Sequence, residues 1–195
     1  MHREQCLRAA AAGLHVICQK PLCDRLTDAE FLVARLRHHP RHFVVHENHR
    51  FRPWFQEVLR LHRTGFFGRI LHLRLEQHDP VEPPQKINLE AERGVWLQYG
   101  VHLADMVHAL LGDPGRVRAW LAHINPRVRG ESLAQVVLEY PDATAAIDVS
   151  WKAAGMRQGG ALLIGGKGRG VLRGLPDAWR DRAIPDLPGQ HGGAG

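Results

Sequence analysis

Apolar and polar positions in the first fifty residues alternate between helical and strand-like spacing, in the order helix, strand, helix, strand. Arg3–Ala12 has the spacing of a short helix and is followed by a glycine, a typical helix stop. The apolar run His15–Cys18 predicts a buried strand. The sequence TDAE from Thr27 has the form of a capping box and predicts a helix that Pro40 ends, before a second strand at His42–His46. This order predicts a parallel βαβ crossover with a leading helix.

After residue 50 the pattern changes to longer strands. A helix is predicted over Trp54–Arg63, next to a proline. In Ile70–Gln77 the residues alternate, so Ile70 is expected to share a face with His72, and Leu71 to lie opposite. Further predicted elements are a loop over Asp79–Arg93, a helix over Val101–Leu111, strands over Val117–Ile124, Leu133–Tyr140 and Ala143–Trp151, and a hairpin of Ala161–Ile164 and Val171–Leu172 around a glycine-rich turn. The first part is therefore α/β with parallel strands, and the second is α+β with a mostly antiparallel open sheet.

Composition narrows the class of protein without naming a function. The 195 residues include 44% hydrophobic and 24% charged residues, and no apolar run is long enough to cross a membrane. The net charge is +6, but the sequence contains no aromatic-plus-basic motif of a nucleic-acid-binding module. No nucleic-acid partner and no membrane partner are therefore predicted. The N-terminus lacks a secretory signal and the three cysteines lack scaffold spacing, which predicts a cytoplasmic protein.

Lysine is scarce in this chain, and one lysine has an unusual place. Among 26 basic side chains the lysines are Lys20, Lys86, Lys152 and Lys167. Lys20 follows a predicted strand and precedes Pro21, at the end of the strand where α/β folds bind ligands. A buried ammonium can take part in acid–base chemistry in a way that a guanidinium cannot. An ordinary surface lysine at a strand end remains an equal alternative on this evidence.

Two further blocks carry candidate chemistry. His102 lies in the first turn of a predicted helix, and Asp105 shares its face three residues later, so the carboxylate could orient the imidazole. The alternative is a histidine that merely packs at a helix start. Glu47–Phe55 connects a strand to a helix and contains polar side chains of the kind that line pockets. Its alternative is a polar connection over two packed aromatic rings.

Several histidines gather between residues 38 and 49, but they do not predict a metal site. His42 and His46 have even spacing on a strand, yet no cysteine or carboxylate set completes a tetrahedron around them. We therefore predict no bound metal. Cys18 lies close to Lys20 and is interpreted as a core residue rather than a nucleophile.

Taken together and in order, these blocks resemble the Gfo/Idh/MocA family of NAD(P)-dependent sugar and cyclitol oxidoreductases. Ala11–Leu22 reads AAGLHVICQKPL, similar to the family's A-x-x-A-G-K-H-V-L-x-E-K-P-L. Asn48–Pro53 reads NHRFRP, like N-x-R-F-x-P, and Thr64–Gly68 reads TGFFG, like G-x-I-G. Gln98–Asp105 reads QYGVHLAD, an echo of D-x-G-x-H-x-x-D.

The resemblance implies a fold, a cofactor and a set of site residues. Residues 1–50 would be the C-terminal part of a Rossmann-like nucleotide-binding domain, 51–175 a substrate and oligomerisation domain, and 176–195 an irregular tail. The implied reaction is hydride transfer between NAD or NADP and a hydroxyl carbon of a sugar, polyol or cyclitol. A homo-oligomer through the second-domain sheet is also implied. The implied catalytic residues are Lys20, His102 and Asp105; the cofactor-binding residues are Lys20, Pro21 and Asn48; the substrate-binding residues are Arg50, Gln98 and Tyr99.

The chain departs from the family pattern in three places. No Gly-x-Gly-x-x-Gly phosphate-binding fingerprint precedes a helix, and Gly165–Gly170 is expected to be a hairpin turn, so we expect a truncated form of the fold. Gln19 and Gln98 stand where the family pattern has a glutamate and an aspartate. Losing both anions should favour a neutral Lys20 and predicts weak turnover that relies on His102 alone. The alternative function is a non-catalytic binding or oligomerisation module on the same fold.

Overall fold

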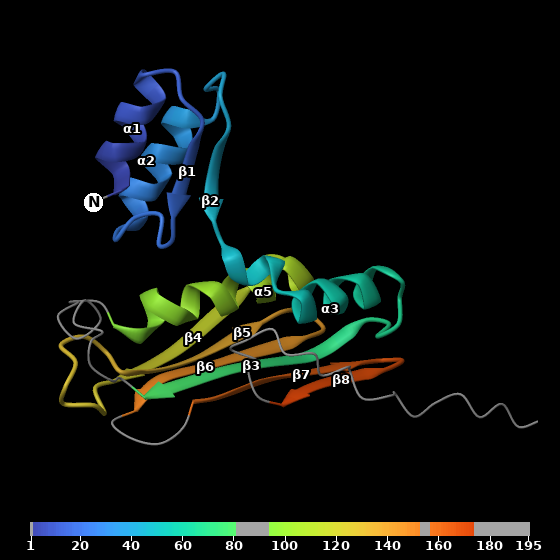
Figure 1. Ribbon diagram of the computed structural model, residues 1–195. Helices are drawn as coiled ribbons and strands as arrows, with labels where there is room; N and C mark the ends of the chain where they lie inside the picture. Colours follow the sequence, from blue (N-terminus) through green and yellow to red (C-terminus); the bar gives the residue numbers. More distant parts are fainter. Residues whose placement is uncertain (1, 81–93, 153–156, 174–195) are drawn as a thin grey trace, which may run out of the picture.

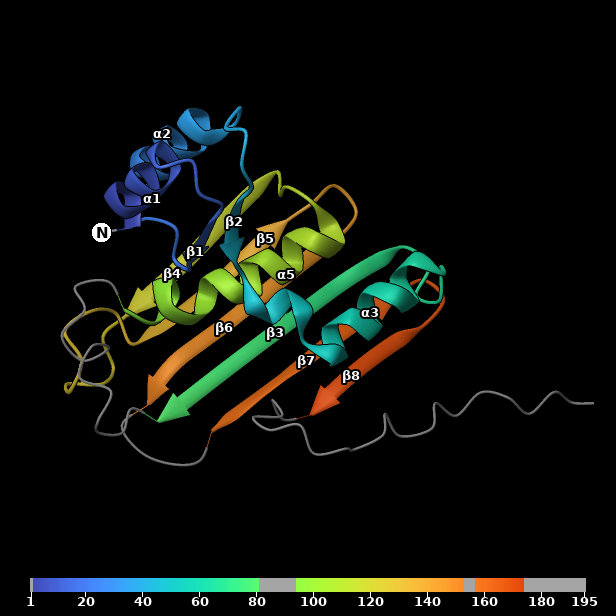
Figure 2. The same ribbon diagram turned by 45° about the horizontal axis from the view of Figure 1, so that its top comes forward.

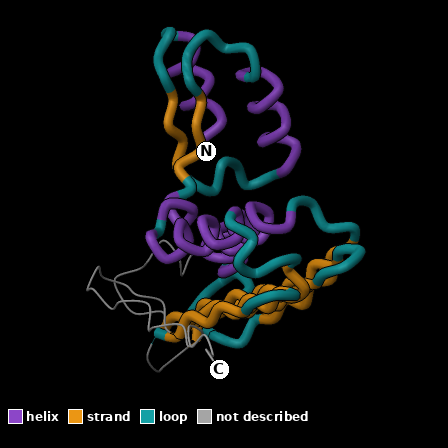
Figure 3. The backbone as a smooth tube through the Cα atoms, turned by 90° about the vertical axis from the view of Figure 1, so that its right-hand side faces the viewer, coloured by secondary structure: helices purple, strands orange, loops and turns teal. Residues whose placement is uncertain are grey.

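The computed structural model describes residues 2–80, 94–152 and 157–173 and places them in three tiers (Figure 1). A small α/β unit forms the upper tier, two helices form the middle tier, and a large sheet forms the lower tier; the same order is seen from the side in Figure 3. The mixed α/β class predicted from the sequence is confirmed, with a small parallel sheet and a larger, mostly antiparallel one.

The small unit is a parallel βαβ crossover with a leading helix, as predicted. Its strands β1 and β2 are parallel, with Val16 opposite Phe43. Both helices pack on one face of this pair, where they bury Cys6, Ala10, Val16, Cys18, Leu32 and Leu36. The elements are α1 (His2–Ala11), β1 (Val16–Gln19), α2 (Leu26–Leu36) and β2 (Phe43–His46).

The larger unit is a six-stranded sheet with the strand order β4-β5-β6-β3-β7-β8. All neighbours in it are antiparallel except β3 and β6. The strands are β3 (Ile70–Pro80), β4 (Arg116–Ala122), β5 (Leu133–Glu139), β6 (Thr144–Lys152), β7 (Gln158–Gly165) and β8 (Arg169–Arg173).

Among the described residues, helices cover the sheet face that is turned toward the small unit (Figure 2). α3 (Pro53–Arg63) and α5 (Val101–Leu111) lie across this face, and their apolar stripes pack on it. The core between helices and sheet buries Phe55, Leu73, Leu75, Leu103, Met106, Val107, Ile147 and Trp151, among others. The chain reaches this core from β2 through the short 3-10 helix η1 (Asn48–Phe51), so η1 lies where the two units meet.

Three local predictions are wrong, each for a physical reason. α2 begins at Leu26, and its cap residue Arg25 makes no side-chain cap bond, so TDAE is not a capping box. Asp28 instead accepts a hydrogen bond from Arg3 of α1 at 2.6 Å, which ties the two helices together. The same helix ends at Leu36, four residues before Pro40.

The third error concerns the start of β3. The predicted alternation places Ile70 on the face of His72 and Leu71 on the opposite, buried face. In the structure Ile70 is buried and Leu71 is exposed. A β-bulge between Ile70 and His72 shifts the register there. A bulge adds one residue to a strand, so side chains before it change face relative to those after it. From Leu73 onward the predicted alternation holds.

Two predicted segments fall wholly or partly outside the described residues. The tail 176–195 lies outside them, and so does most of the loop predicted over Asp79–Arg93, whose first two residues belong to β3. The glycine-rich segment is confirmed as a hairpin turn, because β7 and β8 pair on either side of it. None of the helices in the described residues is long and apolar enough to cross a membrane.

The hairpin glycine Gly165 is expected to tolerate no side chain. A Cβ atom there would lie 2.1 Å from the backbone oxygen of Phe67, whereas at Gly166 the nearest atom would be 3.9 Å away. We expect Gly165→Ala to lower the free energy of unfolding by at least about 3 kcal/mol, because backbone atoms must shift. Gly166→Ala should stay within about 0.5 kcal/mol. Urea unfolding followed by circular dichroism measures both, and equal effects would contradict the predicted clash.

Candidate functional site

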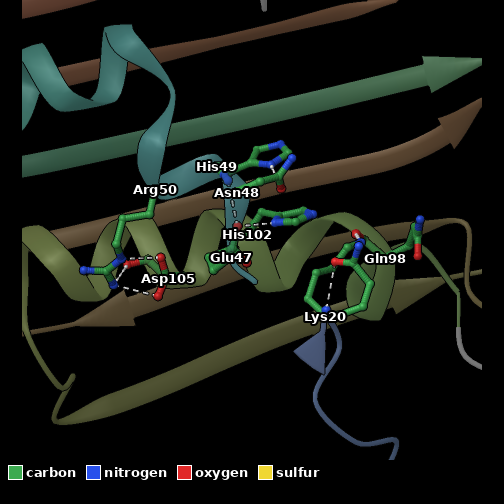
Figure 4. Close-up of polar contacts among 9 residues, drawn as sticks. Lys20, Glu47, Asn48, His49, Arg50, Gln98, His102 and Asp105 are labelled. Atoms are coloured by element: carbon green, nitrogen blue, oxygen red, sulfur yellow. Dashed lines mark hydrogen bonds and ion pairs between the residues drawn. The ribbon is translucent and has the colours of Figure 1, made fainter. Parts of the chain in front are cut away.

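Lys20 projects from the end of β1 toward the larger unit (Figure 4). Its ammonium Nζ donates a hydrogen bond to the backbone oxygen of Gln98 at 2.6 Å, which joins residues 78 positions apart. Burial lowers the pKa of Lys20, and the nearby charge of Glu47 partly opposes this shift. The scarce lysine is therefore held, partly desolvated, at the junction of the two units.

His102 is the second residue of α5 and is only 3% exposed. Its Nδ1 forms a short hydrogen bond with Oε1 of Glu47, which directly follows β2 (Figure 4). Burial raises the pKa of Glu47, but the hydrogen bond and charge of His102 and the backbone amide of His49 outweigh it. The pKa of Glu47 thus lies below its usual value, and the group is a carboxylate at neutral pH.

Asp105 does not hold His102, contrary to the role expected for it. The guanidinium of Arg50 binds the Asp105 carboxylate through two hydrogen bonds, of 2.8 and 2.6 Å. Arg50 offers two donors in a planar fork that matches a carboxylate, and His102 already points its Nδ1 at Glu47. Arg50 and Asp105 therefore form a bridge between η1 and α5, and Glu47 has the position foreseen for Asp105.

The expectation that the site lacks a carboxylate, because Gln19 and Gln98 replace acidic residues, is wrong: Glu47 supplies one. Gln19 and Gln98 bring no charge, yet a carboxylate from a third segment lies against His102 and within electrostatic reach of Lys20. The sequence placed Glu47 in a candidate block but gave no sign that it faces His102, since the two are 55 residues apart. The pKa of Lys20 is lowered as predicted, but the main cause is burial.

His49 is a second residue that sequence reasoning did not assign to the site. Its ring stacks on that of His102, with centroids 3.8 Å apart and planes 14° apart. Burial and the charges of His102 and Arg52 lower the pKa of His49 to about 2, so the ring is neutral. Its Nδ1 lies 3.2 Å from Oδ1 of Asn48, and within the described residues its Nε2 has no hydrogen-bond partner.

Donor atoms of Glu47, His49 and His102 lie within 4.8 Å of one another, close enough for a metal ion. An imidazole binds a metal along a lone pair in the plane of its ring. Because the two rings are stacked and nearly parallel, one ion cannot lie in both planes unless a ring turns. The arrangement suits a stacked histidine pair, with His102 hydrogen-bonded to Glu47, better than a metal centre.

Gln98 and Tyr99 lie on η2 (Trp96–Gly100), a π-helical turn that continues into α5. Gly100 allows this turn to close, because a Cβ there would lie 2.2 Å from the Trp96 ring. Tyr99 packs edge-on against Trp151, and burial together with Asp79 raises its pKa to about 12. The Gln98 side chain extends away from Lys20 in Figure 4. Two of the three predicted substrate residues, Gln98 and Tyr99, thus point away from Lys20.

A cavity of about 660 Å³ opens between the two units beside Lys20. Its charged lining consists of Lys20, Asp24, Arg25, Glu47, Arg50 and Asp105. Its apolar lining includes Pro21, Leu22, Val44, Val45, Trp96 and Val101. The predicted residues Lys20, Pro21, Arg50 and Asp105 therefore meet at one cavity, whereas Asn48, Gln98, Tyr99 and His102 lie outside its lining.

Comparison with known proteins gives a family match over most of the larger unit. A family model described as the GFO/IDH/MocA C-terminal domain matches residues 55–171. D-apiose dehydrogenase of Rhizobium rhizogenes is 31% identical over 153 residues, which cover 77% of this chain and 44% of that protein. Myo-inositol 2-dehydrogenase of Thermotoga maritima is 27% identical over 57% of this chain and 33% of its own length. The chain thus spans less than half the length of these relatives.

Solved structures share the fold. A levoglucosan dehydrogenase in complex with NADH and L-sorbose superimposes with a TM-score of 0.80 at 22% identity, over 89% of this chain and 51% of that one. An oxidoreductase from Agrobacterium radiobacter in complex with NAD+, L-tartaric acid and magnesium gives 0.75 at 25% identity, over 93% and 60%. The fold of the small and large units is therefore shared with these two structures.

Proposed function

Because the chain belongs to the Gfo/Idh/MocA family of oxidoreductases, we propose that it serves hydride transfer between NAD(P) and a hydroxyl carbon of a sugar, polyol or cyclitol. The observation that carries this proposal is the convergence of Lys20 and His102 from separate units. Lys20 reaches across to Gln98 at 2.6 Å, and Glu47 links the neighbourhood of Lys20 to His102. An ammonium and an imidazole close to one cavity are suited to an alcohol that loses its proton.

The cavity fits the nicotinamide end of such a cofactor. Pro21, Val101 and Trp96 give it apolar walls for a flat ring, and Lys20 marks its polar side. Asn48, expected to contact the cofactor, lies on η1 next to this cavity but outside its lining. The 195 residues contain no glycine-rich phosphate fingerprint, so the proposed contacts concern the nicotinamide end alone. When bound, the nicotinamide supplies or accepts the hydride.

The protein groups would handle the proton and the oxygen of the substrate. With Nδ1 hydrogen-bonded to Glu47, His102 presents Nε2 as the base that accepts the hydroxyl proton. The Lys20 ammonium would donate a hydrogen bond to the same oxygen and stabilise the negative charge that develops on it. In the oxidation, one hydroxyl compound and one oxidised cofactor give one carbonyl compound, one reduced cofactor and one proton. In the reverse direction His102 returns the proton to the oxygen.

The experiment that tests this function uses the purified chain. NADH and NADPH fluorescence titrations, followed by oxidation assays with sugars, polyols and cyclitols as substrates, should show cofactor binding below about 1 mM and substrate-dependent NAD(P)H formation. Binding of neither cofactor at millimolar concentration would contradict the proposal for this chain and favour the non-catalytic module. The choice between NAD and NADP is read from the same titrations.

The second part of the proposal concerns the sheet surface opposite the described helices α3 and α5. Strand register places Trp120, Val137, Ile164 and Val171 on it, each at least 40% exposed. Exposed apolar residues on a flat sheet face favour association. We infer that a second copy packs there; a monomer mass by light scattering at 50 μM, a concentration on the order of weak dimer affinities, would contradict this.

A further inference from the structure

Glu47 is the one carboxylate in the described residues that serves both proposed catalytic groups. It accepts the hydrogen bond of His102 Nδ1, and its charge raises the pKa of Lys20 against the effect of burial. Its side chain is 15% exposed, whereas the exposed fraction of the Asp105 side chain is 29%. Asp105 is bound by Arg50, so it is not available to His102.

The backbone fixes Glu47 where both groups can use it. It directly follows β2, whose neighbour β1 delivers Lys20, and the two strands are in parallel register with Gln19 opposite His46. Glu47 also caps η1, because its Oε1 accepts the backbone amide of His49 at 3.0 Å. The parallel pair thus brings the ends of β1 and β2 to one edge, and the cap orients the carboxylate toward α5.

The surroundings of His102 favour one tautomer of its ring. His49 stacks on one face at 3.8 Å and is neutral. The charged groups that act on His49 are His102, Arg52 and Lys20, and the Arg50–Asp105 pair joins η1 to α5, the elements that carry His49 and His102. With Nδ1 held by Glu47, the proton of a neutral His102 lies on Nδ1, and Nε2 keeps the lone pair that a base needs.

We propose that Glu47 is the positioning residue of this site, which fixes the tautomer of His102 and stabilises its protonated form in place of the carboxylates that Gln19 and Gln98 lack. The inference rests on the proposed function for its catalytic meaning. Its structural content, the tautomer of His102, does not require turnover. It also implies that the site is organised by a carboxylate on a segment different from the one indicated by the family pattern.

The first test reads the tautomer directly. Nitrogen-15 long-range correlation spectra of the full chain, with His102 assigned through His102→Gln, should show a protonated Nδ1 in the wild type. Glu47→Ala should remove that preference, because the acceptor is gone, whereas Glu57→Gln should leave the spectrum unchanged. Glu57 is a matched control: it is an ion-paired glutamate of α3 that contacts Arg60 on the surface. An unchanged His102 tautomer in Glu47→Ala would overturn the proposal.

The second test uses kinetics and the near-isosteric variant Glu47→Gln, which keeps an acceptor but loses the charge. We expect kcat to fall about 30-fold with KM within about threefold, since the protonated imidazole loses its counter-charge. Glu47→Asp should recover part of the loss. A Glu47→Gln enzyme within twofold of wild type would overturn the proposal. If the wild type shows no turnover, the proposed function fails while the tautomer experiment still decides the role of Glu47.

Discussion

Replacing His102 by asparagine is expected to lower kcat about 1000-fold. General acid–base catalysis by a positioned side chain contributes about 10²- to 10⁴-fold, and His102 is the imidazole that the proposed function assigns as the base. Asparagine is smaller and can still hydrogen-bond Glu47, but it cannot accept a proton at neutral pH. The measurement is steady-state kinetics with the substrate and cofactor that give turnover in the oxidation assay.

The control for His102 lies on the same helix. His108 has a side chain that is 59% exposed and pairs with Asp113, so His108→Asn should change kcat less than about twofold. Because His102 is buried, the variant must also be shown to fold and to bind NADH as the wild type does. A folded His102→Asn enzyme that keeps more than a tenth of the wild-type kcat would exclude His102 as the base.

Replacing Lys20 by methionine is expected to lower kcat/KM about 300-fold. Removing one donor that stabilises a developing oxyanion costs about 10²- to 10³-fold in other enzymes. Methionine retains the unbranched stem but loses the hydrogen bond to Gln98 and the charge beside Glu47. Lys20→Arg should rescue little of the activity, because the larger planar guanidinium cannot place one donor where the compact ammonium lies.

The control for Lys20 is Lys167, an exposed lysine in the turn between β7 and β8. Lys167→Met should stay within about twofold of wild type in kcat/KM, since the residue lies on a surface hairpin. Full activity in Lys20→Arg would mean that only positive charge is needed at this position. Full activity in Lys20→Met would remove Lys20 from the site altogether.

The order of elements was predictable because local spacing decides it. The βαβ unit, the alternation of β3 after its bulge, and the β7–β8 hairpin follow from apolar periodicity and glycine placement. The bulge at Ile70–His72 and the π-helical turn before His102 were not predictable. Both lie where segments distant in sequence meet: the Gly165 backbone lies against Phe67 next to the bulge, and the Trp96 amide at the start of the turn donates a hydrogen bond to Glu131, 35 residues away.

The site was predictable in part for the same reason. The sequence marked Lys20 and His102, since a scarce lysine at a strand end and a histidine at a helix start are local features that match the ordered blocks of a family. It assigned Asp105 to His102 because residues three apart share a helix face. The sequence did not show whether Asp105 or Glu47 is the hydrogen-bond partner of His102, because Glu47 is 55 residues away and contacts His102 only after folding.

The sequence by itself determined the two kinds of sheet, the family resemblance and the positions of the lysine and the imidazole. These depend on periodicity and on short motifs, which do not need the rest of the chain. Only the tertiary structure decided which carboxylate serves His102, because Arg50 binds Asp105 and the parallel pairing of β1 and β2 brings Glu47 to the same edge as Lys20. Ion pairs form between groups that folding brings together, and their choice depends on competing partners that sequence spacing does not reveal.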